Sequence, residues 1–209
     1  MFTTDRLRLR GFEISDARSI FDLRNNPSVR PMMANQPYVP WGPNFIEKTA
    51  AKAEDAVMYL IIETKGKGSD SEGRANGENR GDELEGVGAR EFVGTTSITI
   101  TRPLKRDGIF IIMLSPKFWG RGYGEEVTRW VVDYTFRSLG LHRLSLGVFD
   151  GNERAKKMYR IVGFVEEGRK RKVHWVDGHW EDIVSMGILQ EEWDLDAHRA
   201  IASVTSIPA

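Results

Sequence analysis

The 209-residue chain contains no cysteine. Disulfide bonds, thiolate metal sites and a cysteine nucleophile are therefore excluded, and nothing covalent cross-links the fold. The chain also has no net charge, because 30 Lys and Arg balance 30 Asp and Glu. Without an overall positive field, we expect neither a nucleic-acid partner nor an anionic membrane partner.

Long apolar runs are missing as well. No run approaches the roughly 20 residues that span a bilayer, and the first ten residues are too polar and too rich in arginine for a secretory signal. The four histidines lack the spacing of metal ligands, so no metal site is predicted; they are His142, His174, His179 and His198. We expect a cytoplasmic protein that needs no metal.

What is present is ordinary globular composition, with 40% apolar and 29% charged residues. Hydrophobic periodicity and turn residues predict helices over 15–26, 44–55, 125–139 and 152–162. They predict strands over 6–10, 57–64, 92–101, 109–114, 143–149, from 164 onward and over 180–189. Ser15 is the expected N-cap of the first helix, and Asp177-Gly178 the turn of a closing hairpin. The fold class is α+β (mixed α/β) with one sheet.

The length predicts one domain, which we place at residues 1–195 with a C-terminal tail at 196–209. Residues 66–90 contain seven glycines and ten charged side chains. A segment with so little apolar surface cannot offset the entropy of ordering it, so we predict a disordered surface insertion. A lid or docking element is the alternative, because long loops sometimes serve that way.

The most informative segment is a glycine cluster between the apolar strand at 109–114 and the helix that follows. Gly120, Gly122 and Gly124 expose backbone N–H groups at the positive end of the helix dipole, which is a device for binding phosphate. Arg121 adds positive charge. A dinucleotide fold is disfavoured, because Glu125 stands where its fingerprint needs Gly or Ala and few residues remain for further βα units. A tight turn without a ligand is the remaining alternative.

Three stretches resemble the GNAT superfamily of acyl-CoA-dependent N-acyltransferases, and most closely the branch containing ribosomal-protein N-terminal acetyltransferases. Residues 114–126 resemble the diphosphate motif, whose pattern is Gln/Arg-x-x-Gly-x-Gly/Ala, with Trp119 in place of Gln or Arg. Residues 152–164 match the second family motif. The closing hairpin, which ends in Asp182, is similar to that of the same branch. The resemblance covers Phe92 to Leu189.

The resemblance implies a single GNAT-like domain with a central, mostly antiparallel sheet of about seven strands and about four flanking helices. Acetyl-CoA is expected as co-substrate, in a V-shaped split of the sheet between the strands ending at Leu114 and near Phe149. The residues expected to bind it are Met113, Leu114, Ser115, Trp119, Gly120, Arg121, Gly122, Tyr123, Gly124, Asn152 and Tyr159.

The implied reaction moves an acetyl group to a primary amine, of a peptide N-terminus or a small molecule, by direct attack in a ternary complex. A backbone N–H at the end of the 109–114 strand would stabilise the developing oxyanion. Tyr159 would protonate or hydrogen-bond the leaving thiolate; its alternative is a core aromatic residue. The alternative function is a non-catalytic sensor of CoA or acyl-CoA. A monomer or a dimer is expected.

The general base is not identified by the sequence. Members of this branch often carry a glutamate on the strand before the glycine cluster, and Ile109 stands at the matching position here. Candidates by residue type alone are Glu91, Asp107, His174 and Asp182, and a base acting through water is equally open. The segment with Met32, Met33, Tyr38 and Trp41 lines the acceptor side in the resembled fold, with ordinary packing as the alternative.

Overall fold

The computed structural model describes residues 1–33, 42, 44–66, 89–100, 103–176 and 178–193. Most of the predicted insertion, the whole predicted tail, Tyr38 and Trp41 lie outside these residues. The helices are α1 (Ala17–Asn25), α2 (Phe45–Asp55), α3 (Tyr123–Arg137) and α4 (Glu153–Val162), with 3-10 turns at Ile14–Asp16, Arg30–Met32, Pro103–Lys105 and Pro116–Phe118. The strands are β1 (Phe2–Thr3), β2 (Leu7–Gly11), β3 (Met58–Thr64), β4 (Phe92–Thr99), β5 (Asp107–Leu114), β6 (Arg143–Phe149), β7 (Val165–Val176) and β8 (His179–Leu189).

The strands form one sheet in the order β1-β2-β3-β4-β5-β6-β8-β7. All neighbours pair antiparallel except β5 and β6. The mixed α/β class and the mostly antiparallel sheet with four helices are confirmed. The additional strand is β1, which has only two residues. Two residues are too few for an alternating pattern, so the sequence gives no sign of this strand.

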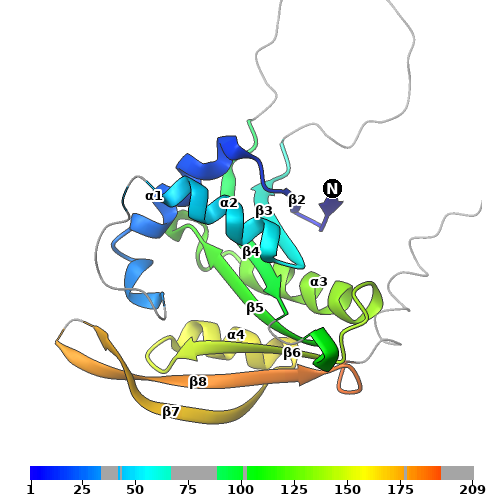
Figure 1. Ribbon diagram of the computed structural model, residues 1–209, viewed down its shortest axis with the longest axis vertical. Helices are drawn as coiled ribbons and strands as arrows, with labels where there is room; N and C mark the ends of the chain where they lie inside the picture. Colours follow the sequence, from blue (N-terminus) through cyan, green and yellow to red (C-terminus); the bar gives the residue numbers. More distant parts are fainter. Residues whose placement is uncertain (34–41, 43, 67–88, 101–102, 177, 194–209) are drawn as a thin grey trace, which may run out of the picture.

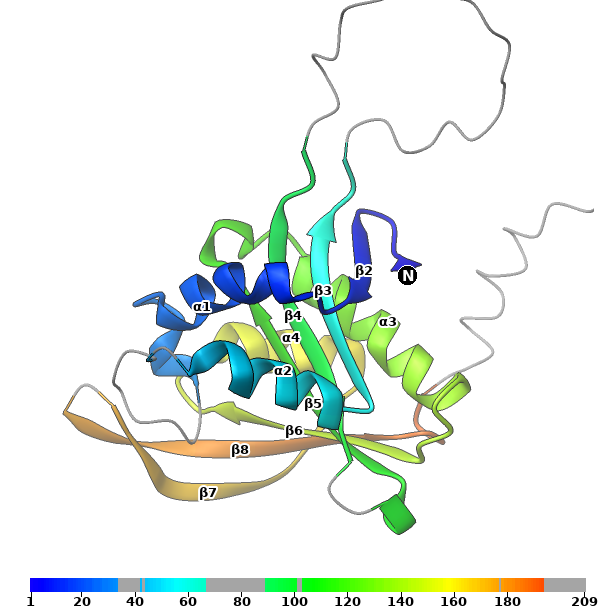
Figure 2. The ribbon, with the colours of Figure 1, turned by 45° about the horizontal axis from the view of Figure 1, so that its top comes forward.

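The helices cover the two faces of the sheet in pairs, with α1 and α2 on one face and α3 and α4 on the other (Figures 1 and 2). The larger core lies on the α3 and α4 face, where Val127 and Val131 of α3 and Leu144 and Met186 of the sheet are fully buried. A smaller cluster of Ile20, Phe45 and Ile61 joins α1 and α2 to the opposite face. Apolar residues on both faces are expected for strands in the middle layer of three.

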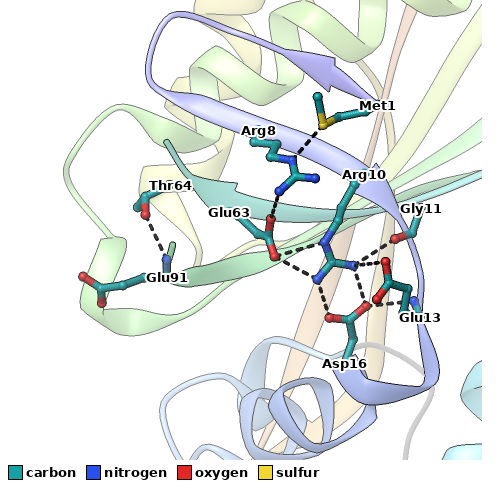
Figure 3. Close-up of polar contacts among 9 residues, drawn as sticks. All are labelled: Met1, Arg8, Arg10, Gly11, Glu13, Asp16, Glu63, Thr64 and Glu91. Carbon is teal, nitrogen blue, oxygen red and sulfur yellow. Dashed lines mark hydrogen bonds and ion pairs between the residues drawn. The ribbon is translucent and has the colours of Figure 1, made fainter. Parts of the chain in front are cut away.

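The start of α1 is set by a charged cluster. Arg10 of β2 contacts Asp16 (Nη2–Oδ1 2.6 Å) and Glu63 of β3 (Nε–Oε1 3.0 Å), as Figure 3 shows. Glu13 and Asp16 form a capping box, and α1 follows with Asp16 as its N-cap. The expectation that Ser15 caps this helix is therefore wrong, because the 3-10 turn at Ile14–Asp16 moves the cap on by one residue.

Candidate functional site

The sheet splits between β5 and β6. In the described chain their parallel pairing covers only Asp107 to Ile109 of β5 against Arg143 to Ser145 of β6. Beyond this point the strands separate toward their carboxyl ends (Figure 1). Gly94 of β4 supports the edge of β5 on the other side, where a Cβ atom would lie 2.1 Å from the Met113 carbonyl oxygen. Only glycine permits this approach of the two backbones.

The glycine cluster connects the carboxyl end of β5 to α3. Gly120 and Gly122 have φ angles of 73° and 78°, in the left-handed region that favours glycine. Gly122 is the N-cap of α3, and its carbonyl accepts the Glu126 backbone N–H at 3.1 Å. Gly120, Arg121 and Gly122 are exposed. The first backbone N–H groups of α3 have no partner within a helix and lie where an anion can reach them.

Trp119 connects this loop to both sides of the split. Its indole Nε1–H donates to the Leu114 carbonyl at 2.9 Å. The guanidinium carbon of Arg154, from the first turn of α4, lies 4.2 Å from the centre of its ring. Sequence analysis missed Arg154, although it follows Asn152 by two residues in the second motif. A positive charge therefore sits beside the residue that replaces the motif's Gln or Arg, but it comes from another helix.

Some backbone groups at the end of β5 already have hydrogen-bond partners. The Ser115 N–H donates to the Val93 carbonyl at 2.8 Å, and the Leu114 carbonyl accepts the Trp119 indole. Met113 and Leu114 are half-buried at the free edge of β5. A pantetheine arm that pairs here like an added strand would use the remaining backbone groups of this edge.

Asn152 begins α4 on the opposite side of the split. Its side-chain Oδ1 accepts the Ala155 N–H at 3.1 Å and caps the helix. Its Nδ2 lies 3.7 Å from the Met32 sulfur. This contact brings the 3-10 turn at Arg30–Met32, which follows α1, against the start of α4. The structure thus places Met32, expected on the acceptor side, beside the predicted cofactor residue Asn152.

Tyr159 lies in the core of the α3 and α4 face, with 8% of its surface exposed. Its ring meets Phe110 edge-on at 6.4 Å and Phe164 at 5.6 Å. Phe110 follows Ile109, where pairing of β5 with β6 ends, so Tyr159 packs against the strand at the split. Burial raises the pKa of its hydroxyl. The side chain is thus a core aromatic residue with a protonated hydroxyl, and its role toward a leaving thiolate stays a prediction.

The four candidate bases already have partners. Glu91 pairs with Lys117, the Asp107 carboxylate accepts the Ser145 hydroxyl at 2.9 Å, and Asp182 accepts the Lys172 backbone N–H at 2.8 Å. The His174 ring packs on Phe149 with ring centres 4.6 Å apart. None of these contacts distinguishes a base, so a proton route through water stays a prediction.

Ile109, at the position where the branch often has glutamate, is 38% exposed on β5. Within the described residues, no group of three or more His, Asp or Glu could hold a metal ion. The same residues include no helix that is long and apolar enough to cross a membrane.

The site thus consists of a split sheet with a glycine loop at one strand end and a capped helix at the other. A comparison with known protein families agrees with this arrangement over most of the chain. The sequence model of the acetyltransferase (GNAT) domain matches residues 6–165. The chain belongs to the GNAT acetyltransferase family. It is an acetyl-CoA-dependent N-acetyltransferase, as the two motifs predicted, and the sensor alternative is not supported.

One relative of this acetyltransferase is the spermidine N(1)-acetyltransferase of Vibrio cholerae. The two are 25% identical over 190 residues, which cover 90% of this chain and 95% of the relative. A crystal structure of the Vibrio enzyme in complex with CoA and spermine has the same fold, with a TM-score of 0.71 at 24% identity over 89% of this chain and 96% of that one. Another structure of that enzyme is described as dodecameric.

A Bacillus subtilis protein carries the name "Putative ribosomal N-acetyltransferase YdaF". It is 31% identical over 81 residues, but these cover only 39% of this chain and 44% of the relative. GNAT membership is thus confirmed, whereas the expected closeness to the ribosomal branch is not specifically supported. The sequence signal was local, because the glycine loop and the second motif are the segments expected to contact the co-substrate and carry little information about the acceptor.

Proposed function

We propose that this acetyltransferase acts on a polyamine, such as spermidine, rather than on a peptide N-terminus. The observation that carries this proposal is the similarity to a spermidine N(1)-acetyltransferase over 90% of the chain. Acidic side chains beside Asn152 support it. Glu153 is exposed, and the Glu181 carboxylate lies against Gly151, where a Cβ atom would be 3.1 Å from its Oε1. Glu153 is already paired with Lys156 at 2.7 Å, so it is the Glu181 charge that would attract a polycation more than a single α-amino group.

The residues on both sides of the split have separate roles in this proposal. The backbone N–H groups of the 119–124 loop, with Arg121, bind the diphosphate of acetyl-CoA, while Asn152 and the free edge of β5 orient its arm. A backbone N–H of this edge stabilises negative charge on the reacting carbonyl oxygen. Tyr159 holds a proton for the departing sulfur. Acetyl-CoA supplies the acetyl group, and the amine attacks it directly.

Release of the CoA thiol with spermidine, spermine and a peptide with a free N-terminus tests the acceptor class. We expect release with the two polyamines and little with the peptide, and the reverse preference would overturn the proposal. Tyr159→Phe tests the site. It should reduce kcat by about 10²-fold, at the low end for general acid catalysis because a thiolate leaves readily. The affinity for CoA should change little, whereas a large loss of affinity would assign Tyr159 to binding alone.

We also propose that the enzyme forms a higher oligomer than the expected monomer or dimer. Support comes from the dodecameric structure of the Vibrio enzyme, which is similar to this chain over nearly its whole length. Light scattering of the purified protein measures the mass directly. A mass of one or two chains at micromolar concentration would restore the original expectation.

A further inference from the structure

One side chain from the amino-terminal end of the protein contacts the glycine loop. Arg6 lies between β1 and β2, some 115 residues before the loop in the sequence. Its Nη1 donates to the Arg121 carbonyl at 2.8 Å, and its guanidinium carbon lies 4.7 Å from the centre of the Tyr123 ring. A single guanidinium therefore contacts both ends of the 121–123 segment.

Arg6 also holds a carboxylate in the first turn of α3. Its Nε donates to Glu126 Oε2 at 2.7 Å, and its backbone N–H donates to Glu126 Oε1 at 2.8 Å. The Thr4 hydroxyl donates to the same oxygen, Oε1. Although partial burial opposes ionisation, hydrogen bonds from Thr4 and Arg6 lower the pKa of Glu126. This carboxylate is therefore ionised and bound by groups of the β1–β2 connection.

Gly122 makes this contact possible. A Cβ atom at this position would lie 3.2 Å from Arg6 Nη2, closer than such contacts normally come. The positive φ of Gly122 already favours glycine. The glycine therefore does two things: it allows the turn into α3, and it leaves room for the guanidinium on the side of the loop.

The charge balance explains why this contact matters for an anionic ligand. A carboxylate in the first turn of a helix is attracted by the helix dipole and competes with an incoming anion for the same positive end. The Arg6 guanidinium offsets this charge while its second nitrogen fixes the Arg121 peptide. Because 49% of the Arg6 side chain is exposed, its positive charge also remains accessible near the loop.

We propose that Arg6 is a positioning residue for the diphosphate of acetyl-CoA. It holds the 121–124 backbone in the conformation that presents its N–H groups, and it neutralises Glu126 at the helix start. This inference rests on the proposed binding of the diphosphate by the loop. Arg6 lies outside both family motifs, and the inference gives it a part in the affinity for the co-substrate.

The test compares two acyl donors, acetyl-CoA and S-acetylpantetheine, which lacks the diphosphate. Arg6→Ala should raise the KM for acetyl-CoA and the Kd for CoA, measured by calorimetry, by about tenfold, the range for losing a charge-assisted contact. Both kcat with acetyl-CoA and kcat/KM for S-acetylpantetheine should stay within about twofold of wild type. Arg6→Lys should not restore the affinity, since an ammonium cannot bridge Arg121 and Glu126 together.

A second variant and a control keep the result interpretable. In Arg6→Ala/Glu126→Gln the repulsive carboxylate is gone, so CoA affinity should recover part of the loss. Arg18→Ala serves as the matched control, because it breaks an exposed ion pair on α1 in which Arg18 Nε lies 3.1 Å from Asp22 Oδ2. This variant should bind CoA like wild type. If Arg6→Ala is poorly folded by thermal unfolding, Arg6→Gln, which keeps a donor, takes its place.

The CoA affinity of Arg6→Ala and its activity with the two acyl donors decide the role of Arg6. Unchanged CoA affinity in Arg6→Ala, or an equal loss with both donors, would overturn the role of Arg6 and leave it a purely structural contact. A loss confined to acetyl-CoA and CoA supports it. If wild-type protein itself binds no CoA in the same calorimeter, the proposed loop site fails, and that failure is visible before any Arg6 variant is measured.

Discussion

At the scale of one residue, the core position of Tyr159 is compatible with the chemical role proposed for it. The phenol is packed between Phe110 and Phe164 and contacts the strand at which the sheet opens. Burial disfavours the charged phenolate, so the hydroxyl keeps its proton at pH values where an exposed tyrosine would begin to lose it. The two interpretations of this residue that the sequence left open are therefore compatible.

This protonation has a consequence for the pH dependence of the rate. Because the pKa of Tyr159 is raised above its ordinary value of 10.0, the proton donor is not lost as the pH approaches 10. We expect kcat to rise with pH as the amine loses its proton and to show no falling limb up to pH 10. Steady-state rates at saturating acceptor measure this profile. A falling limb between pH 9 and 10 that disappears in Tyr159→Phe would contradict it.

Lys156 is a second residue that only the structure makes notable. It is buried beside Asn152, and its Nζ lies 2.7 Å from both Asp150 and Glu153. Hydrogen bonds that this ammonium group donates to the Asp150 and Glu153 carboxylates raise the pKa of Lys156. Lys156→Met leaves Asp150 with Arg169 alone and should lower the free energy of unfolding by about 1 to 2 kcal/mol. Urea denaturation measures this change.

The neighbouring lysine supplies the control for that experiment. Lys157 is exposed on the same helix, so Lys157→Met should change stability by less than about 0.5 kcal/mol. Equal effects of the two substitutions would mean that the Lys156 pairs contribute nothing measurable.

At the scale of elements, the sequence predicted the strands and helices well where periodicity was strong. The end of α2 falls at Asp55 as expected, and β6 matches residues 143–149. The errors lie at element boundaries: α1 begins at Ala17 after a 3-10 turn, and α3 begins at Tyr123 and ends at Arg137, two residues early at each end. Helix ends depend on local hydrogen bonds such as the Glu13–Asp16 capping box, which residue periodicity does not reveal.

Substitution of Gly94 tests whether the pairing of β4 and β5 shapes the site. A Cβ atom would lie 2.1 Å from the Met113 carbonyl oxygen and 2.9 Å from the Leu114 Cα. Gly94→Ala must therefore displace one strand, and we expect a loss of about 1 to 3 kcal/mol in unfolding free energy, as for an overpacked core, with weaker CoA binding. Thermal unfolding and calorimetry measure both effects.

Gly11→Ala is the matched control, because this strand glycine has nothing within 4 Å of a built Cβ. It should leave both stability and CoA affinity near wild type. A tolerated Gly94→Ala with normal CoA binding would show that the strand edge adjusts without cost.

At the scale of the whole molecule, carboxylates in ion pairs join distant parts of the chain. Arg10 joins β2 to β3 and to the start of α1 through Glu63 and Asp16, and Arg6 joins the β1–β2 connection to α3 through Glu126. Although partial burial opposes it, hydrogen bonds from Arg10 and the Glu13 backbone lower the pKa of Asp16. The unfolded chain then binds protons more readily than the folded one.

The lowered pKa of Asp16 makes the fold less stable in acid. A lowered folded-state pKa stabilises the fold fully above the ordinary Asp value of 3.8, and this contribution is lost as the pH falls through the lower folded-state value. We expect Asp16→Asn to destabilise at pH 7 and its difference from wild type to shrink below pH 4. Urea denaturation at several pH values measures it, with the exposed Asp22→Asn as control. A constant difference would remove Asp16 from the acid dependence.

By itself, the sequence determined the family, the co-substrate and the fold class, because the glycine loop, the second motif and the periodicity are all patterns among residues close in the chain. Tertiary structure alone decided which distant side chains complete the loop. Arg6 and Arg154 reach it from a different connection and a different helix, and nothing in their own neighbourhoods indicates that contact. Proximity between residues 115 positions apart results from sheet order and helix packing, which local pattern does not encode.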